Sequence, residues 1–154
     1  MNKNAEALAL LAQAKTIAQQ YYALTGKPLG ITGEVCEYES ARLLDVTLTP
    51  ARQAGYDATE NANGKIRTLQ IKGRYLPQGC TPGQRLGGIR QDKEFDAVLM
   101  VLLDADFNAS EIWEAEREAV VSALNVPGSK ARNERGALTV SKFKAIGQRR
   151  YPKP

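Results

Sequence analysis

The sequence predicts an α/β sandwich built on a central mixed sheet, and three observations predict it. Two stretches with apolar residues at helical spacing come first, at residues 4–24 and 32–44. A hairpin signal at residues 61–64 and a near-continuous apolar run at residues 95–104 follow them. A further strand and a short helix complete the chain, and this order of elements is typical of a sheet packed against helices.

The first helix is expected over residues 4–24, where apolar side chains recur with a helical period. They are Ala5, Leu8, Leu10, Leu11, Ala14, Ile17, Ala18, Tyr21, Tyr22 and Leu24. Gly26 and Pro28 end the helix, because glycine favours the left-handed conformation after a helix and proline cannot continue one. This helix packs on the sheet or forms the surface of a homodimer, and the sequence leaves both alternatives open.

The second helix is expected from Thr32, as its N-cap, through Leu44. Glu34, Glu37 and Glu39 lie in its first turns, where the helix dipole favours negative charge. The helix dipole is by itself a sufficient explanation for these three glutamates, whether or not they have another role.

A hairpin is expected at Asn63-Gly64, the strongest short signal for a two-residue turn. Folding back there pairs the segment around Asp57 with the segment around Gln70. Because side chains alternate between the faces of a strand, Gln70 and Lys72 share one face and Ile71 points into the core. The hairpin therefore brings a carboxylate beside an amide oxygen and an ammonium group.

The remaining elements follow from apolar patterning. Residues 95–104 form the central strand, covered on both faces. A strand over residues 107–115, a helix over residues 116–124 and a short helix capped by Ser141 come next. Residues 148–154 are expected to form a flexible basic tail.

Composition excludes several classes of chemistry. The 154-residue chain has no histidine, which excludes Ser-His-Asp and Cys-His hydrolysis and His-ligated zinc. It has no Gly-Lys-Ser/Thr phosphate loop, so no nucleotide cofactor is expected. Cys36 and Cys80 suit neither a disulfide scaffold nor a zinc site. Without an apolar run of membrane-spanning length or a signal pattern, we expect a cytoplasmic protein with no membrane contact.

The pattern of Asp57 followed by Gln70-Ile71-Lys72 resembles the PD-(D/E)xK phosphodiesterase superfamily. The resemblance implies a restriction endonuclease-like core at 30–147, preceded by the helix at 1–28, within the single domain over residues 1–154 that length and composition predict. That core is a three-layer sandwich around a central mixed sheet. The chain departs from the family pattern at two positions, with Tyr56 in place of a proline and Gln70 in place of an acidic residue.

The resemblance also implies roles for the matching residues. Asp57 and Gln70, with the backbone carbonyl of Ile71, would hold Mg²⁺ or Mn²⁺, since hard cations prefer oxygen ligands. Lys72 would position the attacking water, and Glu34 would correspond to the helical glutamate of the family. The chain is thus expected to be a Mg²⁺-dependent DNA endonuclease-like protein. The alternative is a catalytically inactive module of the same fold that binds nucleic acid or a protein partner.

Charge is distributed in blocks. Residues 65–93 hold seven basic side chains and one acidic one, residues 94–126 hold one basic and eight acidic, and residues 127–154 hold eight basic and one acidic. Basic clusters beside a phosphodiesterase site suit DNA, because phosphate contacts supply most non-specific affinity. The candidate contacts are Arg67, Arg74, Arg85, Arg90, Lys142 and Lys144. The alternative is that acidic and basic blocks neutralise each other on the surface.

Overall fold

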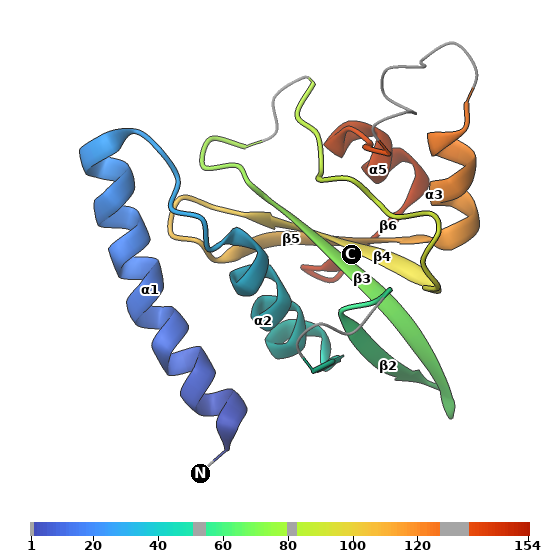
Figure 1. The fold of residues 1–154 in the computed structure, drawn as a ribbon, viewed down its shortest axis with the longest axis horizontal. Coiled ribbons are helices and arrows are strands. Elements are labelled where there is room, and N and C mark those ends of the chain that lie inside the picture. Colours follow the sequence, from blue (N-terminus) through green and yellow to red (C-terminus); the bar gives the residue numbers. More distant parts are fainter. Residues whose placement is uncertain (1, 51–54, 80–82, 127–135) are drawn as a thin grey trace.

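The structure is a computed structural model that describes residues 2–50, 55–79, 83–126 and 136–154. Its centre is a mixed sheet in which the strands lie side by side in chain order (Figure 1). The strands are β1 (Thr47–Leu48), β2 (Ala58–Ala62), β3 (Lys65–Tyr75), β4 (Ala97–Leu103), β5 (Ala109–Glu116) and β6 (Gln148–Tyr151). Neighbouring strands are antiparallel except for β3 and β4, which are parallel. The predicted α/β class with a mixed sheet is therefore confirmed.

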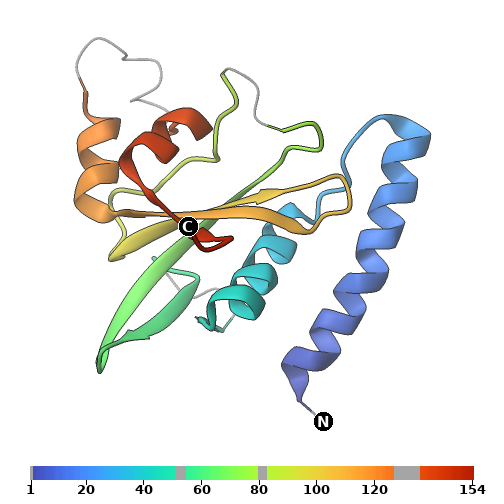
Figure 2. The same ribbon diagram turned by 180° about the vertical axis from the view of Figure 1, so that it is seen from behind.

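Helices cover both faces of the sheet. The described helices are α1 (Lys3–Thr25), α2 (Thr32–Leu44), α3 (Arg117–Leu124) and α5 (Val140–Ile146). Residues of α1 and α2 pack on one face in one apolar cluster, and residues of α3 and α5 pack on the other face in a second cluster. Figures 1 and 2 show these two layers from opposite sides.

The central strand β4 explains why two clusters form. All seven of its residues are buried, and they alternate between the two apolar clusters. Leu99 and Val101 face α1 and α2, whereas Val98 and Met100 face α3 and α5. The apolar run thus marks a strand buried on both faces, as the sequence predicts.

The hairpin between β2 and β3 has the predicted turn. Asn63 and Gly64 have φ angles of 54° and 84°, the left-handed pair that a two-residue turn between twisted strands requires. The side chain of Asn61 accepts a hydrogen bond from Gly64 N at 2.9 Å. Because β4 joins β3 only from Leu69 onwards, the tip of the hairpin extends beyond the rest of the sheet.

The connection from β3 to β4 runs across the face that carries α3 and α5. Its described residues form neither helix nor strand apart from a single bridge between Arg85 and Thr139. Arg117, the first residue of α3, anchors its far end by donating to the carbonyl oxygens of Gln91 and Lys93 at 2.7 and 2.6 Å. Residues 80–82, including Cys80, lie outside the described residues.

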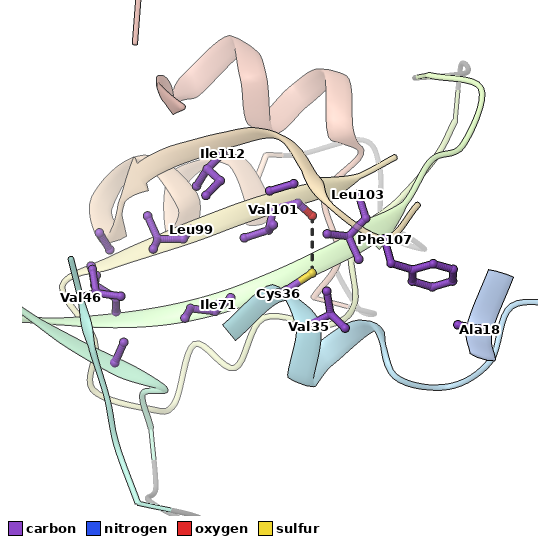
Figure 3. Packing of buried hydrophobic residues seen from close by; sticks show 14 residues of the cluster. Ala18, Val35, Cys36, Val46, Ile71, Leu99, Val101, Leu103, Phe107 and Ile112 are labelled. Carbon is purple, nitrogen blue, oxygen red and sulfur yellow. Dashed lines mark hydrogen bonds between the residues drawn. The ribbon is translucent and has the colours of Figure 1, made fainter. Parts of the chain in front are cut away.

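Helix α2 reaches the sheet through an unusually close contact. A Cβ atom at Gly73 would lie 2.1 Å from Cys36 Sγ, so only glycine permits this approach. Cys36 is fully buried, and its Sγ lies 3.9 Å from the carbonyl oxygen of Val101 (Figure 3). Burial, and then the charges of Glu39 and Glu37, raise the pKa of this thiol, so Cys36 is a packing residue.

One buried carboxylate, that of Glu39, joins three elements. It accepts hydrogen bonds from Lys15 Nζ of α1 at 3.2 Å, from Arg42 Nη2 of α2 at 2.9 Å and from Ala109 N of β5 at 2.9 Å. Burial opposes its ionisation, but the hydrogen bonds of Arg42 and Ala109 and the charge of Lys15 outweigh burial and lower its pKa. The buried Glu39 carboxylate therefore has a structural role, because it joins α1, α2 and β5.

Three local predictions are wrong at the ends of elements. Ile31 rather than Thr32 is the N-cap of α2, and no side chain caps that end. Thr139 rather than Ser141 caps α5, with its Oγ1 accepting from Lys142 N at 3.1 Å. The expected flexible tail forms β6 over Gln148–Tyr151, because the free edge of β5 offers it hydrogen-bond partners.

Within the described residues, no helix has both the length and the apolar character needed to span a membrane.

Candidate functional site

Asp57 lies where β2 diverges from β3. Its backbone N–H donates to Leu69 O at 2.8 Å, and its own carbonyl accepts from Thr49 N at 3.0 Å, next to β1. Its carboxylate oxygen Oδ2 accepts a hydrogen bond from Ile71 N at 2.8 Å. The side chain of Asp57 thus takes the place of a backbone partner for this N–H of β3, beyond the point where the backbone of β2 pairs with it. This contact fixes the carboxylate against the middle of β3.

Gln70 and Lys72 share the face of β3 that carries α3 and α5. In the parallel register Gln70 is opposite Val98 and Lys72 is opposite Met100, and both partners belong to the apolar cluster of that face. Ile71 is opposite Leu99 and is buried in the other cluster, as predicted. Gln70 is only 5% exposed, and its Nε2 donates to Arg90 O at 3.5 Å.

The carbonyl of Ile71 also points towards Asp57. Within a strand the N–H and C=O groups of one residue point towards the same neighbour. Because Ile71 N donates to Asp57, its carbonyl oxygen faces the gap beyond the start of β2. Asp57 and Gln70 line one cavity, and the carbonyl of Ile71 is on the Asp57 side of β3.

Asp57, Gln70 and Lys72 line an open cavity of about 170 Å³. Its lining residues are Gly55, Tyr56, Asp57, Gln70, Lys72, Arg90 and Lys93. Among the described residues, neither Lys72 nor Lys93 has an ion-pair partner within 4 Å, whereas Arg90 pairs with Asp92 at 3.1 Å. Two cations without an ion-pair partner in the described part of the chain, Lys72 and Lys93, therefore line the cavity with the single carboxylate of Asp57, together with the paired Arg90.

Sequence reasoning missed Lys93, which reaches the cavity from the segment preceding β4. It follows Asp92 in a turn, and no motif marks it. Arg117 anchors residues 91–95 and thereby holds Lys93 at the cavity. This long-range contact is not visible in the sequence.

The helical glutamate is not placed as the family pattern implies. Glu34 is exposed on α2 and does not line the cavity. The half-buried Glu37, one turn later, interacts electrostatically with Asp57: burial raises the pKa of Glu37, and the negative charges of Asp57 and Glu34 raise it further. Glu37 is therefore an α2 carboxylate whose pKa is raised by the charge of Asp57 in addition to burial.

The candidate phosphate contacts fall into two groups. Arg67 lies on the opposite face and binds Glu60, Glu114 and Glu116 at 3.2, 3.3 and 2.8 Å. Lys144 binds Glu111 at 3.1 Å and lies 5.5 Å from the centre of the Trp113 ring. Because acidic partners neutralise both charges, these two residues are poorly placed to bind a polyanion.

The other four candidates lie on the same side of the sheet as the cavity. Arg90 lines the cavity itself, and Arg74, on the same face of β3 as Lys72, donates to Gln84 Oε1 at 3.1 Å. Arg85 bridges to Thr139 at the start of α5, the helix that carries Lys142. Within the described part of the chain, neither Arg85 nor Lys142 has an ion-pair partner.

No protein-family model matches the chain, and no curated protein matches it.

The residues at the cavity allow one test of a metal site. Among the described residues, no group of three or more His, Cys, Asp and Glu side chains lies together to hold a metal ion. Mg²⁺ needs fewer, since one or two carboxylates with water and substrate oxygens suffice. Asp57 Oδ1 and Gln70 Oε1 accept no hydrogen bond from the described residues and remain available. The donor set therefore fits a weakly held hard cation.

Proposed function

We propose that this protein is a metal-dependent phosphodiesterase that acts on DNA, with a site of the PD-(D/E)xK type. The observation that supports it is the meeting of Asp57, Gln70 and Lys72 in one open cavity. These three residues are 15 positions apart in the chain at most, but only the register of the hairpin makes them neighbours. The order α2, β1, β2, β3 and the parallel return of β4 agree with a restriction endonuclease-like core.

In this proposal, Asp57 and Gln70, with the carbonyl of Ile71, would hold Mg²⁺ or Mn²⁺. The cation supplies charge stabilisation at the phosphate and lowers the pKa of water. Lys72 orients the attacking water and offsets negative charge at the scissile phosphate. Lys93 holds a neighbouring phosphate, because it lines the same cavity and has no ion-pair partner among the described residues, and Arg90 joins it on exchanging Asp92 for phosphate.

The test is nicking of supercoiled plasmid, branched DNA and single-stranded DNA with Mg²⁺ or Mn²⁺. Asp57→Asn is the sharpest variant, because an amide oxygen still accepts the hydrogen bond from Ile71 N while the charge is lost. The matched control is Asp45→Asn, which changes an exposed aspartate outside the cavity. We expect Asp57→Asn to lower cleavage by roughly 100-fold or more and the control to cleave normally.

Equal cleavage by wild type and Asp57→Asn would show that the site is elsewhere. Lys72→Ala should also lower the rate, by about 10² to 10⁴-fold if this lysine orients the nucleophile. Cleavage on no substrate would contradict the phosphodiesterase proposal.

A second candidate function, DNA binding without cleavage, is favoured by the charge of the cavity. Asp57 is its single carboxylate among the described residues, against Lys72, Arg90 and Lys93. Fluorescence anisotropy of labelled DNA in EDTA separates the two functions. A binding module keeps its affinity there and in Asp57→Asn, and loses it in Lys93→Ala.

A further inference from the structure

A further cavity, of about 380 Å³, lies where the parallel strands β3 and β4 end. Tyr75, the last residue of β3, lines it together with Pro77, and Asp106 lines it from the turn that follows β4. Helix α1 contributes Gln19 and Tyr22. The carboxyl ends of parallel strands are a usual place for ligand sites in open α/β sheets, and this volume is within the range of small-molecule sites.

Two tyrosine rings form an aromatic corner of this cavity. The ring centres of Tyr22 and Tyr75 are 5.7 Å apart, and the angle between their planes is 73°. Tyr75 also stacks on Phe107, with the ring centres 4.5 Å apart and the planes 11° from parallel. Phe107 is fully buried and points towards Ala18 of α1 (Figure 3), so the stack fixes Tyr75 against the core. Tyr22 is 37% exposed and keeps ring surface accessible at the cavity.

The turn that carries Asp106 is held in a fixed conformation. Asp104 Oδ1 accepts hydrogen bonds from Asp106 N at 2.9 Å and from Asn108 N at 3.0 Å. Phe107 has a φ angle of 63°, which large side chains rarely adopt, and its N–H donates to Asp104 O at 3.0 Å. Gln19 of α1 donates to Asp106 O at 3.2 Å. This wall of the cavity therefore exists before any ligand binds, which lowers the cost of binding.

The cavity is negatively charged. Among the described residues that line it, only Asp106 is charged, and in that part of the chain its carboxylate accepts no hydrogen bond and joins no ion pair. Asp104 adds a second negative charge in the same turn. Burial, then Tyr22 and the charges of Asp104 and Asp106, raise the pKa of the Tyr75 hydroxyl. The negative field of the turn thus reaches the aromatic corner.

The neighbouring lysine of α1 does not neutralise this charge. Lys15, one turn before Gln19, binds Glu39 at 3.2 Å and Asn108 at 2.9 Å instead. A negative cavity repels phosphate groups, which excludes the DNA backbone as its ligand. Negative charge beside aromatic rings favours a positively charged ligand.

We propose that this cavity binds a small organic cation of the quaternary ammonium class. Tyrosine rings attract such a cation because their faces are electronegative, and Tyr22, Tyr75 and Pro77 can cover its methyl groups. Asp106 supplies the opposite charge. A bare metal ion fits less well, since it needs several oxygen ligands in place of aromatic surface. The site is independent of the proposed phosphodiesterase, because the two cavities share no lining residue among those described.

Titration of the full chain with choline, followed by amide NMR spectra, tests the proposal. The neutral comparison is neohexyl alcohol, which has the shape of choline with a carbon atom in place of the charged nitrogen. We expect choline to shift the amide signals around Tyr75 and Asp106 with a dissociation constant on the order of 1 mM, and the alcohol to bind about tenfold more weakly. Sodium chloride at equal ionic strength controls for screening.

Two variants separate the aromatic and the acidic contributions. Tyr22→Leu keeps an apolar side chain but removes the ring, and Asp106→Asn removes the charge; each should weaken choline binding by about tenfold. The matched control is Tyr21→Leu, because the neighbouring Tyr21 is 39% exposed but does not line the cavity. It should bind choline as wild type does. The amide spectra of the variants show whether each one is folded.

Three outcomes would overturn the proposal. Equal binding of choline and neohexyl alcohol would remove the role of charge, and unchanged binding in Tyr22→Leu would place the cation elsewhere. Ethanolamine, the counterpart of choline without methyl groups, should bind more weakly, and tighter binding of ethanolamine would contradict the quaternary class. Absence of shifts at about 50 mM choline, far above the expected dissociation constant, would contradict a site for this cation.

Discussion

At residue 70, a neutral amide stands beside Asp57 where a second carboxylate would bind a cation more tightly. Gln70→Glu should lower stability without metal by about 1–2 kcal/mol, because a nearly buried carboxylate replaces an amide whose Nε2 donates to Arg90 O. With Mg²⁺ the same variant should gain more stability than wild type, since the cation joins two carboxylates.

Thermal unfolding at increasing Mg²⁺ concentration measures both effects. Gln84→Glu is the matched control, because Gln84 contacts Arg74 outside the cavity. An equal Mg²⁺-dependent shift in the two variants would contradict cation binding between Asp57 and residue 70.

The second prediction at this scale concerns pH and Glu37. Burial, and then the charges of Asp57 and Glu34, raise its pKa above the ordinary value of 4.5 in the folded protein. Ionised Glu37 therefore opposes folding, and this cost grows as pH rises from 4.5 through the folded pKa. Glu37→Gln should raise the midpoint of thermal unfolding at pH 7, with the difference vanishing below pH 4.5.

Unfolding curves across this pH range provide the measurement. Glu118→Gln serves as the control, since Glu118 is exposed on α3. A gain at pH 7 that persists unchanged in acid would point to helix propensity rather than to the neighbouring charges.

At the scale of elements, local patterns identified most of the fold. The apolar run of β4 and the Asn63-Gly64 turn predict their strands correctly, because both signals arise within a few residues. The end of the chain was missed because β6 exists only through its pairing with β5, more than 30 residues away. The family resemblance likewise suggested Glu34 for the site, whereas Glu34 is exposed and the half-buried Glu37 is the residue whose pKa is raised by burial and by the charge of Asp57.

The close contact between α2 and β3 yields the third prediction. Gly73→Ala places a Cβ 2.1 Å from Cys36 Sγ and 3.0 Å from Cys36 Cβ, so α2 must move away from β3. We expect a loss of about 1–3 kcal/mol, measured by denaturant unfolding. Adding Cys36→Ala should restore part of it, because the nearer clash is with the sulfur.

Gly87→Ala is the matched control, since an added Cβ there meets no atom within 4 Å. Its effect should stay within about 0.5 kcal/mol. A similar loss in both variants would mean that backbone freedom, and not the helix contact, explains the cost at Gly73.

At the scale of the whole molecule, ion pairing separates two kinds of basic residue. On the face of α1 and α2, Arg67 and Arg150 are joined with Glu60 and Glu114 in one ion-pair network. On the other face, Lys144 is paired with Glu111, whereas Lys93 lines the cavity without an ion-pair partner among the described residues. Blocks of charge in the sequence do not distinguish paired from unpaired basic residues. The glutamates of β5 neutralise only those basic side chains that the fold brings next to them.

This separation predicts how DNA binding depends on salt. A side chain that contacts phosphate contributes about 0.9 to the slope of log affinity against log salt concentration. Lys93→Ala should therefore flatten that slope by about one unit. Arg67→Ala removes the same charge but should leave the slope nearly unchanged, because Arg67 is held by three glutamates on the opposite face. Anisotropy titrations with labelled duplex DNA, in EDTA and at several salt concentrations, measure both slopes. Equal flattening in the two variants would mean that DNA affinity depends only on the net charge of the protein. That result would contradict the cavity as the DNA-binding surface.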